Sequence, residues 1–319
     1  MNISPRWAYL AVFIAVTGHA SSEFFAVLIG ISGPEVSVWR FMIGGAGLVL
    51  WALSRADSRD LITPLREEGW PLVGFTMLGV TFPYLAFHWS LDYASVIQVA
   101  TFITTMPIWV GLTNLWLNKQ PFTTAKIVTG SVALLGIALL LTDGYLGALK
   151  GDSNALIGMF LVTVCAALGS SYAVIIKPVV ARHGALRITA VTMMMGGVGL
   201  WLTVGAAFGI WVDPSTLFER SASEATKGIN PGWWILVLGL WNTTITQLLW
   251  FGGLSAAPDI TRASYLFFLK PVIAAVLAIF VLSQNPTMLQ SLAILVVTCS
   301  VFVEMFWPRI ERLFGRSTA

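Results

Sequence analysis

The chain has 319 residues, of which 57% are hydrophobic and only 10% are charged, and its formal net charge is +3. A soluble domain carries about 25% charged residues, so the composition excludes a soluble protein and indicates a polytopic membrane protein. The basic residues lie mostly in short segments between apolar runs, so membrane topology explains them better than nucleic-acid binding does. Cys165 and Cys299 both fall within apolar runs, so we expect neither a disulfide framework nor a metal site.

Ten apolar runs are long enough to cross a bilayer, which takes about 20 residues for each helix. In the first half they cover residues 7–29, 34–53, 70–91, 95–116 and 123–142. In the second half they cover residues 154–176, 185–210, 231–254, 262–282 and 287–307. No cleavable signal peptide is expected, because the first run is itself long enough to span. The predicted fold is an all-α integral membrane protein with ten transmembrane helices.

Lysine and arginine are distributed unevenly between alternate connections. If the N-terminus is cytoplasmic, 13 of the 18 basic residues fall on cytoplasmic segments, and only Lys150, Arg220 and Lys227 fall on the other side. Arg40 and Lys270 lie within spans. Because cytoplasmic segments carry the excess of basic residues, both termini are expected in the cytoplasm.

Short patterns of the first half recur in the same order in the second half. The Gly-Gly-x-Gly pattern of residues 43–48 recurs at 195–200, the Ser-Ser pair 21–22 recurs at 170–171, and Pro107 aligns with Pro271. This shared order predicts a duplication, with one five-helix repeat in residues 1–148 and a second in residues 149–319. Because five is odd, the two repeats have opposite orientations in the membrane. Inverted repeats of this kind are typical of secondary transporters, whose substrate site lies near the membrane midplane.

With these features the chain resembles the drug/metabolite transporter superfamily, in its ten-span EamA-like branch of bacterial metabolite exporters. The likeness covers nearly the whole chain and rests on the duplication, Ser21-Ser22, Trp39-Arg40 and the two aligned prolines. It implies a central cavity formed by spans one to four and six to nine, with spans five and ten at the periphery. Members that export amino acids, especially aromatic ones, are most similar to this Trp- and Phe-rich chain.

Polar and aromatic residues within the spans are the candidates for a substrate-binding cavity, because ionisable and polar groups in a membrane are costly and commonly functional. They are His19, Glu23, Arg40, Tyr84, His88, Gln98, Phe102, Trp109, Tyr172, Trp241, Gln247, Tyr265 and Lys270. The aromatic members could stack against a flat substrate, or they could pack against lipid. We expect no metal and no cofactor among these groups.

Glu23 and Arg40 each lie about six residues from the outer end of a span, roughly 9 Å deep at about 1.5 Å per residue. They are expected to form an ion pair, since one buried charge without a partner is costly. The alternative is that Glu23 exchanges a proton during transport. His19 could line the cavity or be a satisfied helix-interface histidine, and His88 is expected to line an outer vestibule. His183 is expected in a cytoplasmic loop with no special role.

Lys270 and Pro271 stand next to each other in the ninth span. The proline has an equivalent in Pro107, so the two could serve as paired hinges for alternating access, or as static kinks. The lysine aligns with Met106, so its role is specific to one half. It could orient a substrate carboxylate, or it could be an interfacial anchor whose amine reaches the membrane surface.

The sequence favours a transporter over two other classes. We find no metalloprotease, hydrolase or P-loop motif, which argues against a membrane enzyme, and no filter or charge ring that would indicate a channel. The expected function is export of amino acids or similar small metabolites across the bacterial inner membrane, with multidrug efflux as the alternative. The expected partners are a small-molecule substrate and the lipid bilayer, and no nucleic acid is expected. The expected oligomeric state is a monomer.

Overall fold

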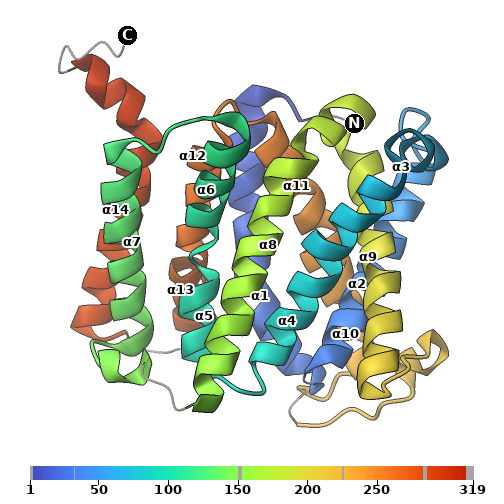
Figure 1. Ribbon diagram of the computed structural model, residues 1–319. Helices are drawn as coiled ribbons and strands as arrows, with labels where there is room; N and C mark the ends of the chain where they lie inside the picture. Colours follow the sequence, from blue (N-terminus) through green and yellow to red (C-terminus); the bar gives the residue numbers. More distant parts are fainter. Residues whose placement is uncertain (1–2, 32, 150–152, 225, 283–285, 314–319) are drawn as a thin grey trace.

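The computed structural model describes residues 3–31, 33–149, 153–224, 226–282 and 286–313, and the regular secondary structure of these ranges is entirely helical (Figure 1). The first half contains η1 (Pro5–Trp7), α1 (Ala8–Ile29), α2 (Pro34–Leu53), α3 (Ile62–Thr76), η2 (Met77–Thr81), α4 (Phe82–Ser90), α5 (Val96–Ile103), α6 (Met106–Asn118), α7 (Thr124–Thr142) and η3 (Leu146–Leu149). The second half contains α8 (Ser153–His183), α9 (Ala185–Phe208), η4 (Pro214–Phe218), α10 (Pro231–Gly239), η5 (Leu240–Ile245), α11 (Thr246–Ala256), α12 (Ile260–Ser264), η6 (Tyr265–Leu269), α13 (Lys270–Leu282) and α14 (Met288–Leu313). The segments η2 and η5 are π-helical, whereas η6 is a 3₁₀-helix.

Eight helical segments of the described chain are long and apolar enough to cross a membrane, which supports a multi-pass membrane protein. They are Pro34–Leu53, Ile62–Ser90, Thr124–Thr142, Ser153–His183, Ala185–Phe208, Pro231–Ala256, Ile260–Leu277 and Met288–Trp307. The predicted span at 7–29 corresponds to α1. The predicted span at 95–116 corresponds to α5 and α6, which are separated at Thr104 and Thr105.

Three predicted segments differ from the structure. Residues 262–282, expected as one helix, fall into α12, η6 and α13. The third span begins earlier than expected, at residue 62, and Gly69 kinks it with a φ of 60° that a residue with a side chain rarely adopts. The sixth span continues to His183, so the prediction that this histidine lies in a loop is wrong. Its Nε2 atom lies 2.8 Å from Oε1 of Glu68, because a helix can extend beyond the apolar run where polar partners are available.

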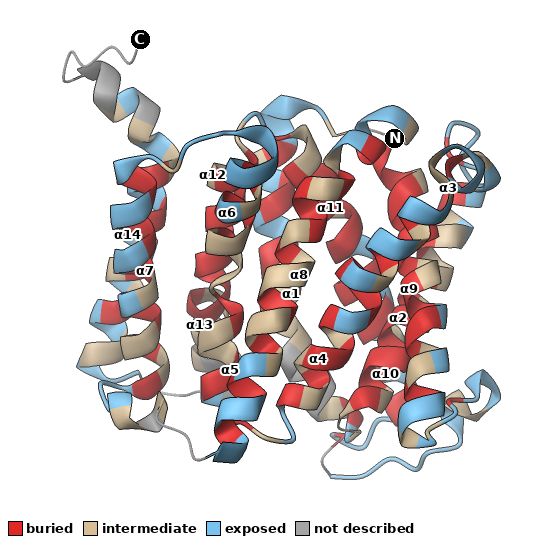
Figure 2. Cartoon of the chain, viewed as in Figure 1, coloured by how far each residue is buried: buried red, intermediate tan, exposed pale blue. Residues whose placement is uncertain are grey.

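The helices form one bundle in which α2 crosses α9 and α7 pairs with α14 (Figure 1). The α7–α14 pair lies at one edge, at the left of the view, and its outer surface is exposed (Figure 2). Only 28% of the apolar window of α14 is buried, against 67% for the window of Pro231–Ala256. The interior of the fold therefore lies among the other helices, where the candidate site is found.

Candidate functional site

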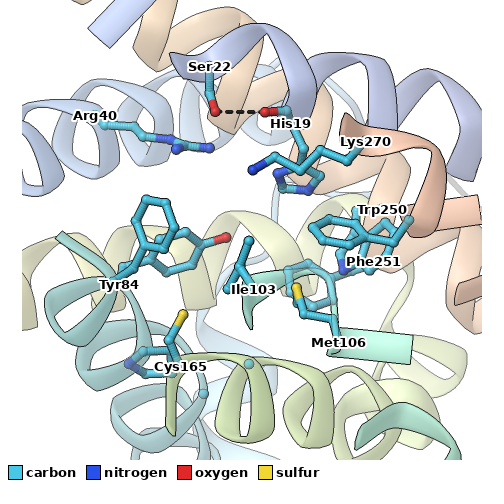
Figure 3. Close-up of a pocket in the computed structure, with 15 residues that line it drawn as sticks. His19, Ser22, Arg40, Tyr84, Ile103, Met106, Cys165, Trp250, Phe251 and Lys270 are labelled. Carbon is cyan, nitrogen blue, oxygen red and sulfur yellow. Dashed lines mark hydrogen bonds between the residues drawn. The ribbon is translucent and has the colours of Figure 1, made fainter. Parts of the chain in front are cut away.

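A narrow cavity of about 60 Å³ lies in the interior, between helices of the two halves (Figure 3). The first half contributes α1, α2, η2, α4, α5 and α6, and the second half contributes α8, α11, η6 and α13. Since one water molecule needs about 10–15 Å³, a cavity of this size holds about four water molecules and no large solute. A substrate can therefore enter only when some of these helices move.

Two cationic side chains reach the cavity from opposite halves. Arg40 comes from α2 and Lys270 is the first residue of α13, and both are buried, with 5% and 6% of their surface exposed. Figure 3 shows the guanidinium group and the amine reaching toward each other beside His19. Two buried cations that converge on one space are suited to bind an anionic group such as a carboxylate.

The π-helical segment η5 holds Arg40 in place. Nε of Arg40 donates a hydrogen bond to Oγ1 of Thr243 (3.1 Å), and Nη2 donates to the backbone carbonyl of Asn242 (2.9 Å). Asn242 in turn donates from Nδ2 to the carbonyl of Gly18 in α1 (2.5 Å). A π-helix makes wider turns than an α-helix and is frequent at functional sites. Here it joins α1, α2 and η5 around the buried charge.

The wall of the cavity beside Lys270 is aromatic. The His19 ring meets Trp250 and Phe267 edge-on, with centroid distances of 5.6 and 5.7 Å, and Trp250 and Phe267 are 5.4 Å apart. Nε2 of His19 is buried and has no hydrogen-bond partner among the residues that the structure describes. This wall is suited to a flat apolar group, because aromatic rings gain energy from edge-to-face and offset contacts.

Helix breaks beside the cavity occur at both aligned prolines. Pro107 is the second residue of α6 and Pro271 the second residue of α13. Neither ring nitrogen can donate to the carbonyl four residues earlier, at Ile103 and Phe267, and both of these residues line the cavity. The Phe267 carbonyl instead accepts from the Lys270 amide, which closes the 3₁₀ turn of η6.

A second and wider cavity of about 680 Å³ lies between α6 and α8, at the end of the bundle where α14 finishes. Its polar lining residues are Asn114, Asn118, Gln120 and Lys177. Asn114 is eight residues, or about 12 Å, along α6 from Met106 in the central cavity. In the stretch that separates the two cavities, the hydroxyls of Thr113 and Ser171 share a hydrogen bond of 2.8 Å that joins α6 to α8.

Of the residues that the sequence placed in the cavity, His19, Arg40, Tyr84 and Lys270 line it. Glu23 lies in α1, but its side chain lies outside the described part of the structure, and so does its expected ion pair with Arg40.

Three further candidates lie directly behind the wall. Trp241 donates from Nε1 to Oγ of Ser21 (2.9 Å), and Gln247 donates from Nε2 to the hydroxyl of Tyr84 (2.5 Å). His88 bonds the Ser37 hydroxyl and the Tyr84 carbonyl, so it joins α2 to α4 and does not face a vestibule. Each of these side chains makes at least one hydrogen bond to another helix, although Oε1 of Gln247 is buried without a partner among the described residues.

The remaining candidates are not among the residues that line the cavity. Gln98 forms a capping box with Ser95 at the start of α5. Phe102 and Trp109 pack on an apolar cluster of α4, α5 and α8 that also contains the lining residues Ile103 and Cys165. Tyr172 is buried against Phe251, with ring centroids 5.3 Å apart. The hydroxyl of Tyr265 donates to the Lys126 carbonyl at 2.6 Å and ties η6 to α7.

Several lining residues were not predicted because they carry no unusual polarity. They are Phe87, Ile103, Met106, Cys165, Phe251 and Phe267. The repeat gave a usable signal for Met106, which aligns with Lys270, and for Ile103 and Phe267, which stand four residues before Pro107 and Pro271. No pattern in the sequence distinguishes the other three from residues that face lipid.

Comparison with known proteins identifies the family and the fold of this chain. The sequence model of the EamA-like transporter family matches residues 6–142 and 156–306. An uncharacterized transporter from Clostridium kluyveri is 21% identical over 282 residues, which cover 87% of this chain and 86% of that protein. A protein of known crystal structure shares the fold, with a TM-score of 0.79 at 18% identity over 96% of this chain and 99% of that chain.

The family match and the Clostridium kluyveri relative place the chain in the class of membrane transporters of small molecules. The chain belongs to the EamA-like transporter family, whose model matches most of its length.

Proposed function

We propose that this protein is a secondary transporter that exports amino acids, with a preference for aromatic and apolar ones, across the bacterial inner membrane. The observation that carries the proposal is the convergence of Lys270 and Arg40 on a cavity that is also lined by the rings of His19, Trp250 and Phe267. The cations fit an α-carboxylate, and the rings fit an apolar side chain. A cationic drug, by contrast, would be repelled by two buried positive charges.

The mechanism we propose is alternating access between two inverted repeats, residues 1–148 and 149–319, with ten membrane crossings and both termini in the cytoplasm. The two separate stretches that the family model matches support this division. So do the π-helical segments η2 and η5 and the breaks at Pro107 and Pro271, which occur in the same order in each half. The basic residues concentrated at alternate connections support the orientation.

In this mechanism the substrate enters from the wider cavity beside α6 and α8. The Thr113–Ser171 hydrogen bond separates that cavity from the central one, so the two helices part when the substrate passes. The breaks before α6 and α13 allow their ends to move without unfolding the remaining turns. The aromatic wall and the two cations then hold the substrate until the opposite side opens.

A transport panel tests the proposal. Liposomes that contain the purified protein are loaded in turn with aromatic, aliphatic, acidic and basic amino acids and with cationic dyes. The efflux of each compound is compared with its efflux from protein-free liposomes. We expect efflux of aromatic and large apolar amino acids above the protein-free rate and no efflux of the dyes. Dye efflux without amino-acid efflux would overturn the assignment in favour of multidrug transport.

A further inference from the structure

A groove on the outer face of the bundle has no part in the proposed transport path. It has a volume of about 380 Å³ and lies between α1, the α12–η6 segment and the C-terminal part of α14. Two arginines, Arg262 and Arg309, line it together with Tyr9 and the apolar side chains of α14. A groove with two cations at the membrane edge is suited to an anionic ligand.

The two arginines differ in how they are held. Nε of Arg262 lies 3.2 Å from Oε1 of Glu304, whose side chain is fully buried, and 18% of the Arg262 side chain remains exposed. This ion pair fixes Arg262 at the bottom of the groove. Arg309 is exposed, with its guanidinium carbon 5.6 Å from the centroid of the Phe306 ring. The ion pair therefore holds Arg262 in a fixed orientation, whereas the exposed Arg309 side chain can move to cover a bound ligand.

Next to the arginines, two phenylalanines of α14, Phe302 and Phe306, form an apolar part of the groove. The rings of Phe302 and Phe306 are 49% and 46% exposed, lie nearly parallel at 11°, and have centroids 6.3 Å apart. Phe302 is seven residues, or about 10 Å, along the helix from Arg309. Along α14 the groove therefore has Arg309 toward the end of the helix and Phe302 about 10 Å away, with Arg262 held beside Glu304 between them.

This polarity matches a phospholipid, which has an anionic headgroup beside apolar acyl chains. Basic pockets between transmembrane helices on the cytoplasmic side are suited to bind such headgroups. The basic excess at this end of the chain, which includes Arg309, places the groove at the cytoplasmic leaflet in the proposed orientation. We propose that the groove binds an anionic phospholipid, with the phosphate between Arg262 and Arg309 and an acyl chain along Phe302 and Phe306.

The test measures lipid retention by native mass spectrometry after the purified protein has been mixed with equal amounts of phosphatidylglycerol and phosphatidylcholine. We expect the wild type to retain phosphatidylglycerol preferentially. Arg309→Gln should reduce that retention about fivefold, the usual contribution of one arginine near a lipid surface. Arg59→Gln is the matched control, because it removes the same charge from an exposed loop residue away from the groove, and its retention should equal that of the wild type.

Two further measurements, of thermal stability and of competition by inorganic phosphate, complete the test. Addition of phosphatidylglycerol should raise the melting temperature of the wild type more than that of Arg309→Gln, and phosphatidylcholine should raise neither. Inorganic phosphate tests the other source of the same chemistry and should not displace the bound lipid. Equal retention of both lipids by the wild type, equal loss in Arg309→Gln and Arg59→Gln, or displacement of the lipid by phosphate would each overturn the proposal.

Discussion

Gly45 of α2 and Gly197 of α9 stand on facing sides of one helix crossing. A methyl group at Gly45 would lie 2.8 Å from Cα of Met194, and one at Gly197 would lie 2.9 Å from the carbonyl oxygen of Phe41. In both cases the obstacle is backbone, which cannot rotate away as a side chain can. The Gly-Gly-x-Gly pattern of each half therefore lets the helix backbones approach closely, as small residues do in membrane proteins.

We expect Gly45→Ala and Gly197→Ala to destabilise the protein by about 1–3 kcal/mol each, the usual cost of overpacking. A thermal melt in detergent measures the change. Gly74→Ala is the matched control, because nothing lies within 4 Å of a methyl group added there. Melting temperatures of Gly45→Ala and Gly197→Ala as high as that of Gly74→Ala would contradict the close crossing.

The breaks at Pro107 and Pro271 make a prediction about transport rate. If each proline keeps a helix end free to move, Pro107→Ala and Pro271→Ala restore a backbone donor, stiffen α5–α6 and η6–α13, and slow the cycle. We expect a lower maximal rate with little change in the substrate concentration for half-maximal transport. Pro64→Ala, at an end of the bundle away from the cavity, serves as control. Unchanged rates in both variants would leave the prolines as static kinks.

Asp259 predicts a pH dependence of stability. Its Oδ2 atom lies 2.7 Å from Nζ of Lys126, and its Oδ1 atom accepts from the Arg262 amide at the start of α12. Burial raises the pKa of the Asp259 carboxyl, but the hydrogen bonds from Lys126 and Arg262 outweigh it, and the pKa lies below its ordinary value. The ionised form is therefore the one that stabilises the fold.

Because the folded-state pKa is depressed, this contribution is complete above about pH 4, the ordinary range of an aspartate, and is lost as the pH falls through the folded-state value. We expect Asp259→Asn to cost about 1.5–3 kcal/mol at neutral pH, as for a hydrogen bond to a charged group. The difference in melting temperature from the wild type should shrink below about pH 4. The exposed Asp92→Asn is the control, and a pH-independent difference for Asp259→Asn would refute the account.

The sequence identified the membrane class and most of the helical segments because a span needs a long apolar run whatever its neighbours are. It did not show which face of each helix meets the cavity. Tyr265 and Lys270 were both expected there, yet residues five apart in a regular helix point about 140° apart. In the structure Lys270 faces the cavity, whereas Tyr265 bonds Lys126 in α7.

A similar limit applies to polar residues that are satisfied by a neighbouring helix. His88 has the polarity of a cavity residue, but the Ser37 hydroxyl of α2 completes its hydrogen bond outside the cavity. Such partners come from tertiary packing, which one sequence does not reveal. The apolar lining, Phe251 for example, is hidden for the opposite reason, because apolar residues fill nearly every membrane-spanning helix.

Chemical labelling of Cys165 can report whether a substrate occupies the central cavity. Its side chain lines the central cavity, and the other cysteine, Cys299, is exposed on α14. In a Cys299→Ser background, a small maleimide reagent should label Cys165 slowly, at the moments when the cavity opens. A transported amino acid should lower the labelling rate, whereas a non-transported one should not. Equal protection by both amino acids would show that the substrate does not occupy this cavity.

The most direct test of the central claim is amino-acid efflux from liposomes that contain wild-type protein, Lys270→Met or Lys270→Arg. If Lys270 binds the substrate carboxylate, Lys270→Met should raise the concentration for half-maximal efflux by about tenfold or more, the cost of a lost hydrogen bond to a charged group. Lys270→Arg keeps the charge and should lose less. Wild-type efflux and an unchanged half-maximal concentration in Lys270→Met would contradict the account and leave this lysine as an interfacial anchor.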